Sequence, residues 1–231
     1  MTRIVVLTGA GLSAESGLGT FRDKDGLWTE YDLADVATPE GFSRNPHLVH
    51  EFYNTRRANC LDAEPNAAHH ALALLEEAIG PRLTLVTQNV DDLHERGGAS
   101  NVIHMHGELA KALCTQCDAR WPAPRAMAAL DPCPECRLPR TRPDIVWFGE
   151  MPYGMSRING ALRQADLFVA IGTSGNVYPA AGFVTEARAA GARTLELNLE
   201  PTQMQNAFDD AIYGPASQVV PEWVGSMLAA Q

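Results

Sequence analysis

Short apolar runs recur along the chain, and each is followed by small or polar residues. Because the runs are short and rich in β-branched side chains, we interpret them as buried strands, at residues 4–7, 83–86, 102–108, 144–148, 167–171 and 193–197. Stretches with apolar residues at helical spacing lie at 46–60, 66–79, 178–190 and around 220–228. This alternation predicts an α/β fold, a doubly wound, Rossmann-like parallel sheet.

Two dipeptides mark helix starts before the longest helical stretch. Thr38-Pro39 and Asn45-Pro46 each join a capping residue to a proline at the first helical position. We expect the residues around them, about 30–65, to form the helical part of a second, smaller domain.

The first predicted strand runs directly into a glycine-rich turn. Gly9, Gly11 and Ala14 follow it in the spacing G-x-G-x-x-A. In that arrangement the first glycine makes the turn, the second lets a pyrophosphate approach the backbone, and the small third residue lets a helix pack on the strand. The helix N-terminus then offers N–H groups to phosphates. An ordinary strand–turn–helix is the alternative, but the position after the first strand favours nucleotide binding.

The stretch after this turn differs from that of a standard dehydrogenase, which continues into a second strand ending in Asp or Glu. Residues 17–31 are instead polar and punctuated by glycine, with Phe21, Arg22 and Trp28 among them. Loops of this length in compact domains are usually functional or disordered. The embedded aromatic and arginine side chains lead us to predict a lid that orders over a ligand.

Polar or small residues also follow three later strands. Open α/β sheets bind ligands at the carboxyl ends of their strands, which should gather along one edge. We therefore predict cofactor contacts from Gln88, Asn89 and Asp91 after 83–86, from Gly172, Thr173 and Ser174 after 167–171, and from Asn198 or Glu200 after 193–197. Asp91 could alternatively cap the helix that carries His94, and the two roles are compatible.

Two histidines lie in the segment 102–108, where strand alternation places His104 and His106 on one face. Imidazole titrates near neutral pH, so either could act as a general base. His106 is the better candidate because it lies at the strand end beside Gly107. The alternative is a hydrogen-bonded structural histidine, which is common in strands.

Four of the five cysteines form the pattern Cys114-x-x-Cys117 followed by Cys133-x-x-Cys136. This spacing is typical of a structural zinc site. The surrounding residues 109–142 could hardly build a core of their own, so we predict a zinc-nucleated module inserted between residues 1–108 and 143–231 of a Rossmann-like domain. A nucleic-acid-binding zinc ribbon is disfavoured by the acidity of the chain, and disulfides are disfavoured by the expected cytosolic setting.

The composition limits the classes of molecule that the protein is expected to bind. The net charge of −10 argues against a sequence-independent nucleic-acid binder and favours the attraction of lysine-rich protein segments. Neither a signal peptide nor a membrane-spanning run of about 18 apolar residues is visible, so we expect a cytoplasmic protein without a membrane segment. We also expect a monomer.

The motifs together resemble those of the sirtuins, the NAD-dependent protein deacylases. The segments GAGLSAESG, TQNVDDLH, HMHGE, VWFGE, GTSG and NLEP, with the four cysteines, occur in the family's order over nearly the whole chain. The likeness is greatest to the compact bacterial type related to the class that removes acidic acyl groups. It implies an enzyme that consumes NAD to remove acyl groups from protein lysines, including acetyl, succinyl and malonyl groups, and releases nicotinamide and O-acyl-ADP-ribose.

The resemblance also implies roles for individual residues. It makes His106 the general base, with Asn89 and Asp91 holding the nicotinamide and its ribose. It places a further set in the cofactor site: Gly9, Ala10, Gly11, Ala14, Glu15, Thr20, Phe21, Arg22, Trp28, Gln88, Gly172, Thr173, Ser174, Asn198, Leu199, Glu200 and Ala216. Residues 146–150, including Val146, Phe148, Gly149 and Glu150, would pair with the substrate backbone as an added strand.

The resemblance gives Tyr53 and Arg56 a role that their spacing alone does not suggest. By spacing alone they project from one helix face and are a core tyrosine and a solvated arginine. The resemblance makes them the Tyr-x-x-Arg pair that binds the distal carboxylate of succinyl- or malonyl-lysine, with Ala37 leaving room for the longer chain.

Two competing functions remain at this point. One is an NAD-dependent mono-ADP-ribosyltransferase on the same scaffold. The other is a non-catalytic NAD-binding or zinc-ribbon module, against which His106 argues.

Overall fold

The computed structural model describes residues 2–19 and 31–229. Within them a parallel, six-stranded sheet has the order β3-β2-β1-β7-β8-β9. Its strands are β1 (Ile4–Thr8), β2 (Leu83–Thr87), β3 (Val102–His104), β7 (Leu167–Ile171), β8 (Arg193–Asn198) and β9 (Asp210–Tyr213). The predicted α/β class and Rossmann-like sheet are confirmed.

The strand order changes direction beside β1. β2 and β3 follow β1 on one side, whereas β7, β8 and β9 lie on the other. Open α/β sheets bind ligands outside the carboxyl ends of the strands at such a switch point. The turns after Thr8 and Ile171 are therefore the place in this fold where a dinucleotide is expected.

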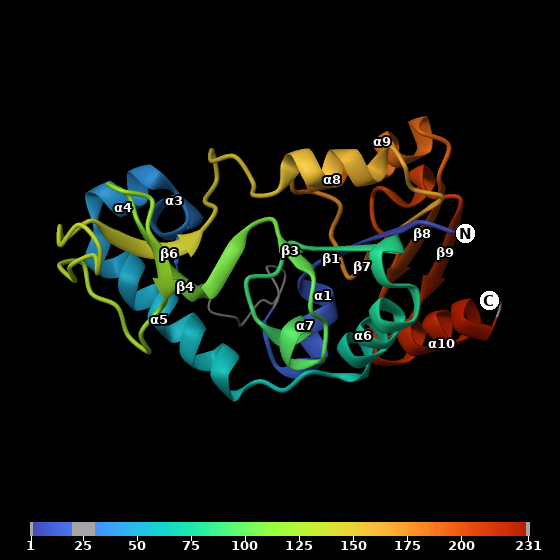
Figure 1. Ribbon diagram of the computed structural model, residues 1–231, viewed down its shortest axis with the longest axis horizontal. Coiled ribbons are helices and arrows are strands. Elements are labelled where there is room, and N and C mark those ends of the chain that lie inside the picture. The colour runs from blue at the N-terminus through green and yellow to red at the C-terminus, as the bar shows by residue number, and fades with distance from the viewer. Residues whose placement is uncertain (1, 20–30, 230–231) are drawn as a thin grey trace.

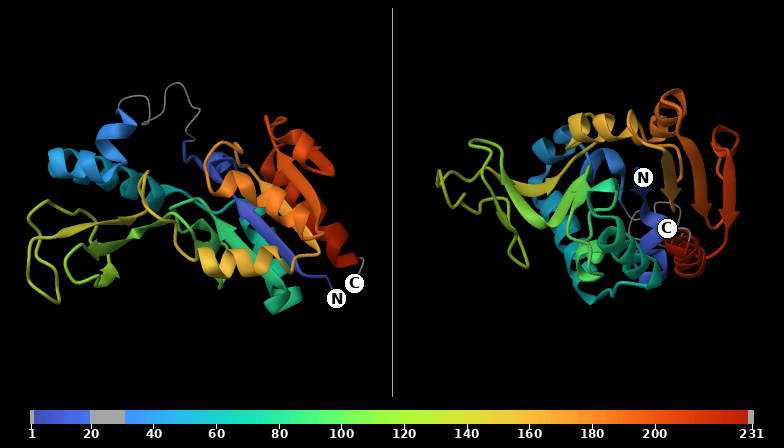
Figure 2. Two further views of the ribbon diagram at one scale, coloured as in Figure 1. Left: turned by 90° about the horizontal axis from the view of Figure 1, so that it is seen from above. Right: turned by 45° about the vertical axis from the view of Figure 1, so that its right-hand side comes forward.

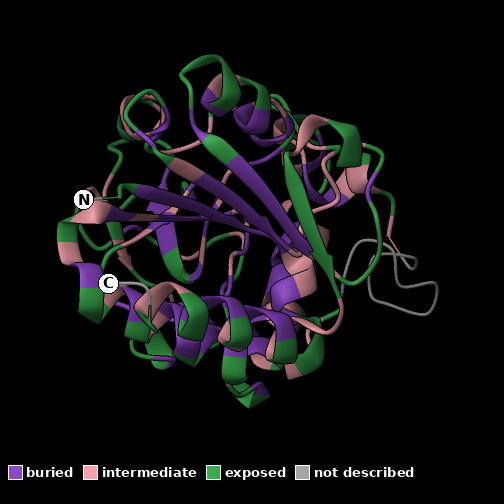
Figure 3. Cartoon of the chain, turned by 90° about the vertical axis from the view of Figure 1, so that its right-hand side faces the viewer, coloured by how far each residue is buried: buried purple, intermediate pink, exposed green. Residues whose placement is uncertain are grey.

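Helices cover both faces of the sheet (Figure 3). α6 (Ala67–Ile79) and α10 (Ala216–Ala229) pack on one face, and α8 (Met155–Leu162) and α9 (Phe183–Ala189) pack on the other. Alternate residues of β1 serve the two layers, because Val6 joins the core under α6 and α10 while Val5 and Leu7 join the core under α8 and α9. Burial on both faces explains why the strand sequences are continuous apolar runs.

A second lobe lies at the left of Figure 1 and is seen from above in Figure 2. It contains a three-stranded antiparallel sheet of order β5-β4-β6, made of β4 (Gly107–Cys114), β5 (Arg120–Pro122) and β6 (Thr141–Ile145). Beside it lie α3 (Leu33–Val36), α4 (Pro39–Arg44) and α5 (Pro46–Asp62). The predicted caps are present: Thr38 Oγ1 accepts the Gly41 N–H, and Asn45 Oδ1 accepts the Leu48 N–H.

The predicted single strand 102–108 is wrong, because the chain divides this segment between the two sheets. β3 ends at His104, and β4 begins at Gly107. Gly107 has φ 82°, and a Cβ at this position would lie 2.0 Å from the Asp144 carbonyl oxygen. The glycine therefore allows the abrupt passage from one sheet to the other.

Two further boundaries differ from the prediction. The strand expected at 144–148 is β6, Thr141–Ile145, whose residues Arg142, Pro143 and Asp144 do not read as an apolar run. The helix expected over 178–190 begins only at Phe183, after a 3₁₀ turn at Ala180–Gly182. At β6, pairing with β4 outweighs the local pattern.

The remaining described elements are short. They are α1 (Ala10–Ser13), α7 (Leu93–Arg96) and the 3₁₀ turns η1 (Ala14–Ser16), η2 (Gly80–Arg82), η3 (Ala180–Gly182) and η4 (Gln205–Ala207). Sequence periodicity did not predict α8, β5 or β9. Within residues 2–19 and 31–229, none of the helices combines the length and apolar character needed to cross a membrane.

Candidate nucleotide site and metal centre

The turns after β1 and β7 interlock through their backbones. The Gly9 N–H donates to the Ile171 carbonyl at 3.0 Å, and the Gly11 N–H donates to the Gly172 carbonyl at 2.9 Å. A Cβ on Gly11 would lie 2.8 Å from Gly172 Cα, and a Cβ on Gly9 would lie 2.8 Å from the Gly172 oxygen. The glycines of the G-x-G motif are thus already required by the approach of another turn of the protein, before any phosphate is considered.

The helix that follows this turn is shorter than the motif predicts. α1 is a single turn of four residues, Ala10–Ser13, with Gly9 as its N-cap. The Gly11 N–H is bonded to Gly172 and the Leu12 N–H to Gly9. The free helix N-terminus expected for phosphates is therefore largely occupied by protein groups.

Asn89 follows β2, and its side chain contacts the turn that follows β1. Its side-chain nitrogen donates to the Gly9 carbonyl at 3.1 Å and to Ser13 Oγ at 3.0 Å, and its N–H donates to Thr87 Oγ1 at 3.0 Å. A carbonyl only accepts, so the amide nitrogen must face Gly9. The amide oxygen of Asn89 is consequently directed away from these partners, and Asn89 is only 8% exposed.

Asp91 is a buried carboxylate, 7% exposed. Burial raises its pKa, and hydrogen bonds from the Leu93 N–H and the Ser13 hydroxyl oppose that shift. The Leu93 bond, 3.2 Å from Oδ1, lies at the first residue of α7, although the N-cap position belongs to Asp92. The predicted capping contact is therefore present, and it holds the carboxylate beside Ser13.

His106 lies between the two sheets, in the turn that joins β3 to β4. Its Nδ1 is 3.1 Å from the Gln88 carbonyl, and its own carbonyl accepts the Val146 N–H at 2.8 Å. Because the Gln88 oxygen can only accept, Nδ1 carries the hydrogen and the lone pair of the neutral ring is at Nε2. Burial lowers the pKa of His106, and the Gln88 hydrogen bond opposes this only in part.

This pKa shift predicts the acid side of the pH profile. A general base acts when neutral, and the lowered pKa keeps His106 neutral to below its ordinary 6.5. We expect kcat/KM, which reports the pKa of the free enzyme, to fall on acidification with a midpoint below pH 6.5, measured as nicotinamide release from pH 5 to 7.5. A midpoint above 6.5 would contradict the assignment of this limb to His106.

The other predicted cofactor residues lie at the ends of β7 and β8, beside the start of α10, and outside the described residues. Asn198 Nδ2 donates to the Thr173 carbonyl at 2.8 Å, which joins the ends of β8 and β7. The Glu15 carboxylate accepts the Ser217 N–H at 3.0 Å, one residue beyond Ala216 at the start of α10. Leu199 and Glu200 are exposed beyond β8. The predictions for Thr20, Phe21, Arg22 and Trp28 lie outside the described residues.

The predicted substrate residues lie against the same site from the second lobe. Trp147 Nε1 donates to the Tyr53 hydroxyl at 3.0 Å, and the Phe148 N–H donates to the Ala37 carbonyl at 3.0 Å. Together with the bond from Val146 to His106, these contacts connect the acyl-group residues to the proposed base.

Residues 146–150, which the resemblance implies would pair with the substrate backbone, lie beyond β6 in a turn. The Glu150 N–H donates to the Trp147 carbonyl, and the Trp147 N–H donates to Glu150 Oε2. Arg142 binds the same carboxylate through two nitrogens, at 2.7 and 2.8 Å, and lies 3.4 Å from the Trp147 ring centroid. Glu150 is therefore a structural anchor of this turn, and a substrate backbone would find mainly carbonyl groups here.

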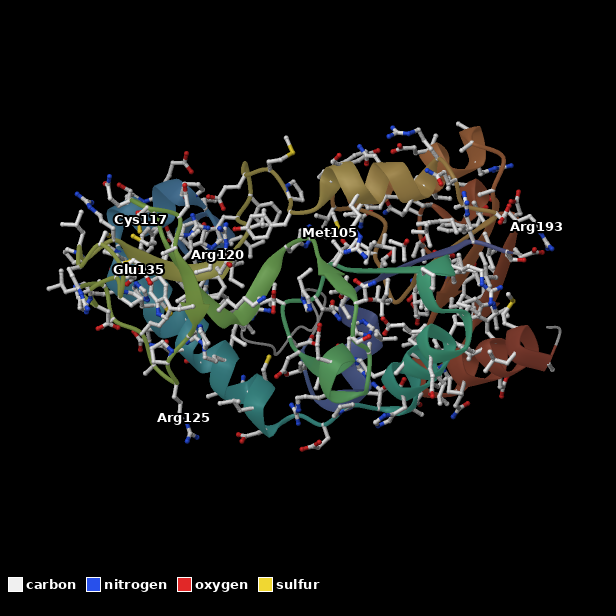
Figure 4. All side chains as sticks on the ribbon, viewed as in Figure 1. Met105, Cys117, Arg120, Arg125, Glu135 and Arg193 are labelled. Carbon is white, nitrogen blue, oxygen red and sulfur yellow. The ribbon has the colours of Figure 1, made fainter. Side chains whose placement is uncertain are left out.

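The four paired cysteines converge at the far end of the second lobe. Their sulfurs all lie within 4.8 Å of one another, with Cys114 and Cys136 3.6 Å apart and Cys117 and Cys133 3.7 Å apart. Zn–S bonds of about 2.3 Å in a tetrahedron require sulfurs about 3.8 Å apart. The four thiolates fit one structural zinc ion, as predicted, and Figure 4 shows Cys117 far from Met105, which lies where the lobes meet.

Some residues at the site were missed from sequence. Ser13 and Thr87 hold Asn89, and Arg142 binds Glu150 in the turn after β6. Single polar residues within or beside apolar runs carry no periodic signal, so only their contacts disclose them.

Fold and site define a class: a two-lobed protein with a Rossmann-like dinucleotide sheet and a tetracysteine zinc module. The sequence model of the Sir2 family matches residues 9–179, and the chain belongs to that family. The resemblance to the sirtuins is thereby confirmed.

Curated relatives and solved structures agree with this assignment. An NAD-dependent protein deacylase of Caulobacter vibrioides is 60% identical, covering 98% of this chain and 97% of that protein. One of Escherichia coli K12 is 58% identical, covering 98% and 82%. A Sir2 homologue–NAD complex has a TM-score of 0.89 and 39% identity, covering 98% and 90%, and a Sir2 protein bound to acetylated peptide has 0.80 and 26%, covering 97% and 92%.

Proposed function

We propose that this protein is a protein-lysine deacylase that consumes NAD and yields nicotinamide and O-acyl-ADP-ribose. Relatives of the chain carry the name NAD-dependent protein deacylase, and related structures hold NAD or acetylated peptide. The observation that carries the proposal is the position of His106: its Nδ1 is fixed by Gln88, the residue beside Asn89, so that Nε2 is available as a base.

The residues at the strand ends take their roles from this geometry. NAD supplies the ribose carbon that loses nicotinamide and accepts the acyl oxygen. The amide oxygen of Asn89 and the carboxylate of Asp91 orient the nicotinamide ribose. Nε2 of His106 accepts a proton from a ribose hydroxyl. The phosphates are expected beside the interlocked turns at Gly11 and Gly172, and Asn198 lies where the second ribose is expected.

One incubation separates this function from the alternative. The protein is incubated with NAD labelled in its adenosine part and an acetyl-lysine peptide. We expect equal amounts of free lysine peptide, nicotinamide and labelled O-acetyl-ADP-ribose. Label transferred to protein, without deacylated peptide, would instead establish a mono-ADP-ribosyltransferase, and NAD binding without either product would establish a non-catalytic module.

We further propose that the enzyme removes succinyl and malonyl groups as well as acetyl groups. The Arg56 guanidinium lies 5.8 Å from the Phe52 ring centroid and 5.9 Å from that of Tyr53, against the apolar wall of the second lobe. Desolvation lowers the pKa of Arg56, which remains a cation at neutral pH. The Tyr53 hydroxyl accepts the Trp147 N–H, so its own hydrogen can be given to an acyl carboxylate. A carboxylate bound there would receive charge-assisted hydrogen bonds.

Replacing Arg56 by methionine tests this selectivity. A hydrogen bond to a charged group contributes about 1.5–3 kcal/mol, so we expect the ratio of succinyl to acetyl kcat/KM to fall tens-fold. Arg44, exposed on α4, provides the matched control, because Arg44→Met removes an equal charge away from this wall. An unchanged ratio in Arg56→Met would show that another group selects the acyl chain.

We propose the division into a Rossmann-like domain, residues 1–108 and 143–231, and an inserted zinc module, residues 109–142. The small sheet supports this with slightly wider limits, since it runs from Gly107 to Ile145. The helices between Leu33 and Asp62 pack against the same sheet through a shared core. The cytoplasmic location, the monomeric state and the lack of nucleic-acid binding stay predictions, which fractionation, size-exclusion chromatography and a nucleic-acid binding assay would test.

A further inference from the structure

A histidine other than His106 contacts the backbone of Asn89. The Asn89 carbonyl oxygen lies 3.3 Å from His104 Nδ1. The other contacts of Asn89, to Gly9, Ser13 and Thr87, use a backbone carbonyl and two hydroxyls. None of those three groups changes charge between pH 5 and 9, so among these contacts only the one from His104 has a titratable donor.

His104 is fixed between two acceptors. Its side chain is 7% exposed, and its Nε2 lies 2.8 Å from Glu95 Oε1 on α7. A carbonyl and an ionised carboxylate accept hydrogen bonds but cannot donate them. Both contacts are therefore hydrogen bonds at once only when both ring nitrogens carry hydrogen, which is the imidazolium cation.

The position of His104 in the sheet explains how one side chain can contact both Asn89 and Glu95. It is the last residue of β3, the edge strand, and it pairs in register with Thr87, whose hydroxyl holds the Asn89 N–H. The edge places one imidazole beside both the turn after β2 and the helix α7. The N–H of Asn89 is therefore bonded to Thr87 on β2, and its carbonyl is contacted by His104 on β3.

The surrounding charges favour the cation. Burial alone would lower the pKa of His104, but the hydrogen bond and charge of Glu95 and the charge of Glu108 on β4 outweigh burial and raise it above 6.5. For Glu95 too, burial is outweighed, and the contact with His104 lowers its pKa. Asp91 faces the same imidazole, and His94 on α7 is buried and has a pKa well below 6.5, so it stays neutral.

We propose that His104, paired with Glu95, is a positioning residue for the proposed deacylation: as a cation it clamps the Asn89 backbone, and on deprotonation it releases it. The neutral ring can donate from only one nitrogen, and the ionised Glu95 carboxylate is a stronger acceptor than the Asn89 carbonyl, so Asn89 loses its partner. The rate therefore declines on the alkaline side of a bell-shaped profile whose acid side belongs to His106. The inference rests on the proposed function.

The test is kcat/KM for acetyl-peptide deacylation from pH 6 to 9 in five proteins, the wild type and four variants. Wild type should show a descending limb centred above pH 6.5. Glu95→Gln should move that limb to lower pH, whereas Glu40→Gln, an exposed control on α4, should not. His104→Leu should lower kcat/KM by about three- to ten-fold below the midpoint of the wild-type limb, the effect of one hydrogen bond, and should make little difference well above it, where the wild-type ring has already released Asn89. His104→Asn, whose amide nitrogen replaces Nδ1–H and does not titrate, should recover most of that loss and abolish the limb.

A second measurement is independent of turnover. NMR titration of the His104 ring in the NAD-free protein should give a pKa that falls in Glu95→Gln and is unchanged in Glu40→Gln. A wild type without deacylation would refute the proposed function, while the titration would still report on the pair. A descending limb that persists at the same pH in His104→Asn, or a His104 pKa insensitive to Glu95→Gln, would overturn the inference.

Discussion

His106→Ala is expected to lower kcat for deacylation by about 10²–10⁴-fold, the usual contribution of a positioned general base, with little change in NAD affinity. Among the described residues the imidazole hydrogen-bonds only to the Gln88 carbonyl, so its removal should leave the interlocked turns at Gly9 and Gly172 intact. Turnover is measured as nicotinamide release, and NAD affinity by calorimetry.

A matched control is available on α5. His47 is exposed, and His47→Ala removes an imidazole far from the strand ends without expected effect on either quantity. The assignment fails if His106→Ala retains turnover close to wild type. Loss of NAD binding together with turnover would instead show that the ring supports the cofactor site rather than the proton transfer.

Removing one zinc ligand should have the largest effect on stability. Cys133 is fully buried among the four sulfurs, and Cys133→Ala leaves three ligands for an ion that requires four. Zinc binding in small modules supplies on the order of 10 kcal/mol of folding free energy, so we expect residues 109–142 to lose zinc and unfold. The measurements are zinc content, protease sensitivity of that segment, and melting temperature.

The same variant should lose activity although the zinc site touches neither substrate. β6 connects the cysteines to residues 146–148. The Val146 N–H donates to the His106 carbonyl, and the Phe148 N–H donates to the Ala37 carbonyl. Unfolding of the small sheet would free both contacts. Cys60→Ala serves as the control, since Cys60 is a buried thiol outside the cluster, and we expect full zinc content with a stability loss of about 1 kcal/mol. Full zinc content in Cys133→Ala would contradict the assigned ligand set.

Much of the larger domain could be predicted because its signals are local. β1, β2, β7 and β8 are buried on both faces, so each is a short apolar run visible in the sequence. The small sheet could not be predicted in this way. β6 contains Arg142 and Asp144, which are buried only because Glu150, Arg120 and Tyr153 bind their charged groups. A polar segment of this kind becomes a strand only when its partners are present.

The chain by itself determined the strands β1, β2, β7 and β8, the helix caps at Thr38 and Asn45 and the paired-cysteine pattern, because each of these signals depends on neighbours within a few residues. Tertiary structure alone decided why Gly11 must be glycine, how the side-chain amide of Asn89 is turned, and that His104 contacts the backbone carbonyl of Asn89 from the edge of the sheet. Those features depend on the approach of segments such as Gly9 and Asn89, which are 80 residues apart. Distances of that kind are set by packing and leave no periodic mark in the sequence.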